Sequence, residues 1–65
     1  MAWKASELNI HDKTMYWLTR NANGIFNFGV VDESLAHIFN TVQDARVAAK
    51  SCAGHDKEDV KFIKC

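Results

Sequence analysis

The clearest local pattern is a pair of apolar-rich runs on either side of Asn23-Gly24. Residues 14–20 and 25–31 are rich in aromatic and β-branched side chains, which favour strands. Asn-Gly suits a two-residue type I′ turn, because both central residues of that turn need a positive φ. The pattern therefore predicts a β-hairpin in which Ala22 lies opposite Ile25.

This register divides the hairpin side chains between two faces. Trp17 lies opposite Val30 and Thr19 lies opposite Phe28, on the face with the larger aromatic area. We expect that face to form the core, because a sheet buries its more apolar side. The opposite face carries the alternate residues, which are Tyr16, Leu18, Arg20, Gly29 and Val31.

A helix is predicted after Thr41. Thr41 suits the N-cap, and Asp44 stands three residues later, where an acid favours the positive end of the helix dipole. The helix should run from about Val42 to Ala53 and end before Gly54, which suits the left-handed residue after a helix. Its apolar stripe consists of Val42, Ala45, Ala49, Cys52 and Ala53, with Ala48 at the edge. These small side chains would let the helix lie close to the large residues of the core face.

The remaining segments include one predicted strand, at the C-terminal end, and two segments whose structure the pattern leaves ambiguous. Residues 6–10 alternate as a short first strand, because Leu8 and Ile10 are separated by polar residues. Residues 34–39 either continue the second strand beyond a bulge or form a third strand. Residues 60–65 form a final strand with Val60 and Phe62 on one side, and it should lie at a sheet edge.

Together these elements predict an α+β fold with two layers. We expect an antiparallel sheet of three to four strands with one helix packed on one face, in the order β-β-(β)-α-β. The chain of 65 residues has room for a single domain over residues 1–65, with residues 1–6 as a candidate flexible end.

Charge and hydropathy exclude several classes of function. Eight basic and eight acidic residues give a net charge of zero, which disfavours a nucleic-acid binder because neutralising phosphates needs an excess of Lys and Arg. No apolar run approaches the roughly 18 residues that cross a bilayer, so no membrane association is expected. The N-terminal residues lack the apolar core of a signal peptide, so we expect a cytoplasmic protein.

Metal binding and catalysis have weak support. Cys52 and His55 have the spacing of a zinc knuckle, Cys65 follows, and His37 or His11 would complete a tetrahedral set. A second paired knuckle is missing, and the alternative is that Cys52 is a small core side chain and Cys65 a terminal thiol. No phosphate-binding loop or nucleophile motif is present, so a non-enzymatic protein without a cofactor is expected.

The sheet face away from the helix is more apolar than a solvated face. Either Met1 and Trp3 fold over it, or it binds another protein, since tyrosine and arginine are frequent at interface centres. The edge of the final strand offers a second route, through β-augmentation. The predicted partner-binding residues are Tyr16, Leu18, Arg20, Lys61 and Lys64. The alternatives are a DNA- or RNA-binding sheet face, with Tyr16 stacked on a base, and a small zinc-stabilised module.

The order of motifs resembles a known family. The alternating run at residues 6–13, the Met15-Tyr16-Trp17 strand, the helix start at residues 41–45 and the final Ile63-Lys64-Cys65 are similar to the short podophage-encoded inhibitor of bacterial RNA polymerase. The hairpin here is longer, and Lys61 and Lys64 do not keep the spacing of that family's basic pair. The resemblance implies a small protein that binds and blocks a host or cellular protein complex such as a transcription or defence complex. We expect the chain itself to be a monomer or a homodimer.

Overall fold

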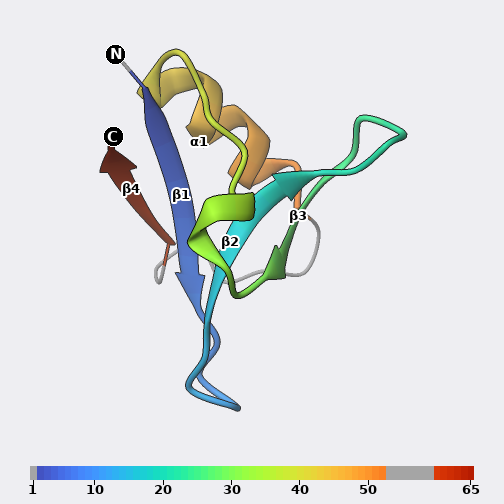
Figure 1. The fold of residues 1–65 in the computed structure, drawn as a ribbon, viewed down its shortest axis with the longest axis vertical. Coiled ribbons are helices and arrows are strands. Elements are labelled where there is room, and N and C mark those ends of the chain that lie inside the picture. Colours follow the sequence, from blue (N-terminus) through green and yellow to red (C-terminus); the bar gives the residue numbers. More distant parts are fainter. Residues whose placement is uncertain (1, 53–59) are drawn as a thin grey trace.

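The computed structural model describes residues 2–52 and 60–65 as an antiparallel sheet with one α-helix and one short 3-10 helix (Figure 1). In chain order the elements are β1 (Trp3–Leu8), β2 (Met15–Arg20), β3 (Phe26–Val30), η1 (Glu33–Leu35), α1 (Val42–Lys50) and β4 (Val60–Lys64). The sheet has four strands in the order β3-β2-β1-β4. The predicted α+β architecture, with one helix on one face, is confirmed.

The loop of the β2–β3 hairpin is one residue longer than predicted. The Asn21 side-chain oxygen accepts hydrogen bonds from the backbone N–H groups of Asn23 at 2.8 Å and Ile25 at 3.0 Å. Asn21 also pairs with Ile25 through the backbone, and Gly24 adopts a φ of +79°. This is a three-residue loop with glycine in the left-handed position, a common hairpin geometry. The hydrogen bonds to the Asn21 side chain therefore stabilise a three-residue loop, and the predicted two-residue turn is wrong.

The longer loop shifts the register of the hairpin by one residue. The observed pairs are Arg20–Phe26, Thr19–Asn27, Leu18–Phe28 and Trp17–Val30. Only the last pair follows the prediction, because the register shifts between Trp17 and Leu18 and leaves Gly29 as an extra residue. A one-residue slip moves side chains to the other face. Phe28 consequently shares its face with Leu18, and the predicted core face is wrong.

The helix α1 starts as predicted and ends earlier. The Thr41 hydroxyl accepts a hydrogen bond from the Asp44 N–H at 3.1 Å. The helix ends at Lys50, and the C-cap Ser51 donates its hydroxyl to the Ala48 carbonyl at 2.6 Å. Local bonding by this serine satisfies a carbonyl that a longer helix would use. The predicted terminal residues Ala53 and Gly54 lie outside the described residues.

The hydrophobic core lies between α1 and one face of the sheet. Its buried members are Ala5, Leu18, Phe28, Phe39, Ala45, Ala48, Ala49 and Cys52. Leu18 and Ala5 have no exposed surface. Small residues of α1 meet large residues of the sheet, as the sequence predicted, but Leu18 takes the place that was assigned to Trp17.

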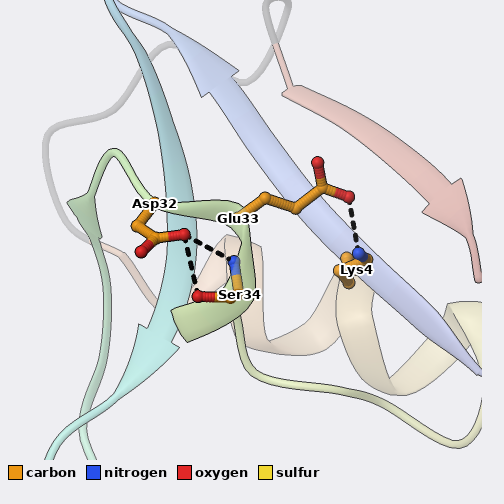
Figure 2. A network of polar contacts seen from close by, with 4 residues as sticks. All are labelled: Lys4, Asp32, Glu33 and Ser34. Atoms are coloured by element: carbon orange, nitrogen blue, oxygen red, sulfur yellow. Dashed lines mark hydrogen bonds and ion pairs between the residues drawn. The ribbon is translucent and has the colours of Figure 1, made fainter.

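The opposite face is covered at its centre by η1. Trp17 is only 6% exposed, although it lies outside the core cluster on the helix side. The Lys4 ammonium lies 5.6 Å from the Trp17 ring centroid and binds the Glu33 carboxylate at 2.6 Å. Figure 2 shows the ion pair between Lys4 and Glu33. It also shows Asp32, which accepts hydrogen bonds from the N–H and hydroxyl of Ser34. Trp3 packs against the core on the helix side and so does not cover this face, and Met1 lies outside the described residues.

Residues 36–40 connect the two faces by passing between β1 and β2. Paired residues of β1 and β2 run only from Leu8–Met15 to Ser6–Trp17. Beyond that point the His37 N–H donates to the Leu18 carbonyl at 2.9 Å. Phe39 forms an antiparallel bridge with Trp3, with N–O distances of 2.8 and 2.9 Å. The third strand considered for residues 34–39 is thus reduced to η1 and one bridge.

The first and last strands of the chain, β1 and β4, pair with each other. β1 begins at Trp3, so residues 3–6 are strand rather than the expected flexible end, and Ile10 lies in the following turn. β4 forms an edge of the sheet beside β1, as predicted. Val60 and Phe62 pack against the core, which confirms their shared side.

Candidate protein-interaction surfaces

The five predicted partner-binding residues do not form one surface. Leu18 is fully buried and packs against the helix layer, so its assignment to an open face is wrong. Tyr16 packs against the same core and is half-buried. Arg20 is exposed at the end of β2, whereas Lys61 and Lys64 are exposed on β4. The shift in register accounts for this difference. It places Phe28 on the same face as Leu18 and Tyr16, and this is the face that α1 covers.

The hydroxyl of Tyr16 forms a hydrogen bond with a nearby residue of the chain. It donates a hydrogen bond of 2.7 Å to the Asp12 carboxylate in the β1–β2 loop. This bond, with that from the Thr14 N–H, holds the pKa of Asp12 below its ordinary value of 3.8. The same bond raises the pKa of Tyr16 above 10.0, because the phenol must stay protonated to donate. Tyr16 therefore fixes the loop to the core edge.

The β4 edge presents backbone hydrogen-bonding groups away from the sheet. The Cys65 N–H donates to the Ala2 carbonyl at 2.8 Å, and hydrogen-bonded pairs alternate along an antiparallel ladder. In this register the backbone groups of Lys61 and Ile63 point toward β1. The N–H and C=O groups of Val60, Phe62 and Lys64 therefore point outward, where another strand can pair with them.

Four cations flank this edge. Arg46 and Lys50 of α1 line a small pocket of about 180 Å³ with Val60 and Phe62. The Arg46 guanidinium lies 5.8 Å from the Phe62 ring centroid. Lys61 and Lys64 extend the positive charge along both faces of β4, since neighbours in a strand point to opposite sides. None of the four cations, which are Arg46, Lys50, Lys61 and Lys64, forms an ion pair with a residue in ranges 2–52 or 60–65.

Sequence reasoning found only half of this basic edge. Arg46 and Lys50 are four residues apart, a spacing that places two side chains on the same side of a helix. This spacing predicts that the two side chains lie together on the helix. It does not predict that they lie beside β4, because that depends on how α1 packs in the fold.

A second, larger hollow lies between α1 and the β2–β3 hairpin. Its volume is about 690 Å³, and the rings of Phe26, His37 and Phe39 are among the side chains that line it. Within it the His37 ring contacts Phe39 at a centroid distance of 4.6 Å and Phe26 at 5.5 Å. Ile25 of the hairpin and Val47 of α1 line its walls and are largely exposed. We call this hollow the hairpin groove.

The candidate zinc residues are not assembled in the described structure. The Cys52 thiol is buried and donates to the Phe26 carbonyl at 3.4 Å, which fits a core role. Cys65 is exposed at the end of β4, and His55 lies outside the described residues. His37 packs among aromatic rings, and His11 lies in the β1–β2 loop. Residues 2–52 and 60–65 hold no group of three potential metal ligands.

Comparisons with protein-family models, with curated proteins and with solved structures found no match to this chain. No helix in the described ranges has the length and apolar character needed to cross a membrane.

Proposed function

We propose that the protein is a non-catalytic, cytoplasmic binding module that takes up an extended acidic segment of another protein along β4. The observation that carries this proposal is the coincidence of an outward-facing strand edge with four cations, none of which forms an ion pair with another described residue. Backbone pairing would supply affinity, and side-chain pockets and charge would supply selectivity.

The structure of β4 suits β-augmentation better than that of β3. The β3 edge is interrupted by the irregularity at Gly29, and bulges of this kind protect sheet edges from pairing. β4 pairs with β1 in a continuous register from Val60 to Lys64. The pocket under Arg46 would accept an apolar side chain of the added strand, and acidic residues beside it would meet Lys61 and Lys64.

The narrower role implied by the family resemblance belongs to the same proposal. The protein would block a host complex by occupying a segment that the complex needs, without chemistry. Bacterial RNA polymerase is the first purified complex to test, because the resembling family acts on it.

Capture from a nuclease-treated bacterial lysate tests the proposal. The baits are the wild type, K61E/K64E, K64P and K64Q, with K13E as a charge-reversal control in the β1–β2 loop. Lys64→Pro removes an outward N–H, whereas Lys64→Gln removes only the charge. We expect a protein that binds the wild type, K13E and, more weakly, K64Q, and that is lost with K64P and K61E/K64E.

Two outcomes would reject the proposal. One is a set of captured proteins that all five baits retain equally. The other is binding that is seen only in a parallel lysate without nuclease and that falls steeply with salt, which would identify nucleic acid as the ligand of the cations.

A further inference from the structure

The hairpin groove is a second candidate interaction surface, and among the residues that the structure describes none from β4 lines it. Ile25 is 61% exposed on the hairpin wall and Val47 is 58% exposed on the α1 wall. Between these walls lie the rings of Phe26, His37 and Phe39. Such an apolar surface favours contact with protein side chains.

The groove carries one unpaired charge of each sign on its two walls. The Arg20 guanidinium lies beside Gly24 on the hairpin, where a Cβ added to Gly24 would stand 3.1 Å from Nη2. Asp44 belongs to the first turn of α1 on the other wall. Within the described ranges neither residue forms an ion pair.

This charge pattern is complementary to itself. A two-fold axis between two copies makes every contact occur twice. If one residue of the first copy contacts a second residue of the other copy, the reverse contact also forms. Arg20 of each copy would then face Asp44 of the other, giving two ion pairs for one geometry. Ile25 and Val47 would be removed from water by the same approach.

We propose that the chain forms a two-fold dimer in which the β2–β3 hairpin of each copy lies in the hairpin groove of the other. The net charge of zero leaves no overall repulsion between copies. A domain of 65 residues has a small core, and apolar contact between copies adds burial that one copy lacks. This proposal goes beyond the binding role of β4 and does not depend on it.

Charge exchange between two variants tests this arrangement. Sedimentation equilibrium of the wild type should show a reversible monomer–dimer equilibrium. R20D alone and D44R alone each place two like-charged pairs in the dimer, and each should raise the dissociation constant about tenfold or more. An equimolar mixture of the two variants should dimerise again, because the unchanged Asp44 meets the unchanged Arg20 and the two introduced charges also pair.

Matched controls separate this geometry from general attraction. K13D and Q43R alter charge in the same directions outside the groove, and neither should weaken the wild-type dimer. Melting curves of all variants confirm that each is folded. K61E/K64E should dimerise like the wild type, so failure of the β4 proposal and failure of this one are distinguishable.

Three results would overturn the dimer. The first is a wild type that stays monomeric up to millimolar concentration. The second is a dimer that both R20D and D44R retain, which would place the interface elsewhere. The third is a mixture of K13D and Q43R that associates more tightly than the wild type, which would show nonspecific charge attraction.

Discussion

The two faces of the sheet are covered by different means. α1 covers one face with the buried residues Ala45, Ala48 and Ala49, which approach Leu18 and Phe28 closely. η1 covers the other, and its Glu33 binds Lys4, whose ammonium lies over the Trp17 ring. The contact of α1 with the sheet is apolar, whereas η1 is a short element that an ion pair links to β1.

This difference determines which surfaces are open for the binding proposed above. Because α1 and η1 both lie on faces, neither face offers a continuous open surface among the described residues. The outer edge of β4 and the hairpin groove remain accessible.

The largest expected effect is loss of the helix-side core. Leu18→Ala should lower the free energy of unfolding by about 2–5 kcal/mol, because it removes a fully buried side chain and leaves a cavity. A domain of this size has only about 3–5 kcal/mol of core stabilisation, so much of the variant should be unfolded. Urea unfolding followed by circular dichroism measures the change. Leu35→Ala, on the exposed side of η1, should shift stability by less than about 0.5 kcal/mol. Equal losses in the two variants would contradict the assignment of the core.

Overfilling the helix face should have an intermediate effect. Ala45 has no exposed surface, so Ala45→Leu must push α1 away from the sheet. The expected cost is about 1–3 kcal/mol in the free energy of unfolding. Gln43→Leu adds the same side chain at an exposed position of the first turn and should be nearly neutral. An Ala45→Leu variant as stable as Gln43→Leu would show that the helix does not lie close to the sheet.

The smallest effect is expected from the η1 face. Glu33→Gln removes the ion pair of Lys4, and exposed pairs contribute little to stability. The unfolding transition should therefore stay near that of the wild type, while acrylamide quenches Trp17 fluorescence more strongly. A Trp3→Phe background leaves Trp17 as the reporter. Unchanged quenching would mean that the ion pair does not hold η1 over the indole.

The same variant has a defined consequence for pH. The hydrogen bond from Lys4 to Glu33 raises the pKa of Lys4 above its ordinary value of 10.5. A raised pKa in a basic group means that the contact stabilises the fold below pH 10.5, and the contribution is lost as pH rises through the raised value. In Glu33→Gln the pKa of Lys4 should return toward 10.5 in an NMR titration of its side chain.

The local elements were largely predictable, because their signals lie in neighbouring residues. Thr41 and Asp44 marked the start of α1, and the alanine spacing marked its buried side. The aromatic and β-branched runs marked β2 and β3, and the alternation of Val60 and Phe62 marked β4. Each of these patterns is short in sequence and depends little on distant contacts.

The assignment of faces failed for a specific physical reason. Two hydrogen bonds accepted by the Asn21 side chain lengthen the hairpin loop, and that single residue moves Phe28 to the face of Leu18. The cover of Trp17 depends on Lys4 and Glu33, which are 29 residues apart. A contact of that separation has no local pattern, so the open face was expected where η1 now lies.

The arrangement of the two faces is tested most directly by a NOESY spectrum of the folded protein. The account predicts cross-peaks from the Leu18 methyl groups to the methyl groups of Ala45, Ala48 and Ala49, and from the Trp17 indole to the side chain of Lys4. Cross-peaks from the Trp17 indole to the α1 alanines, with none from Leu18, would place the helix on the other face and contradict the account.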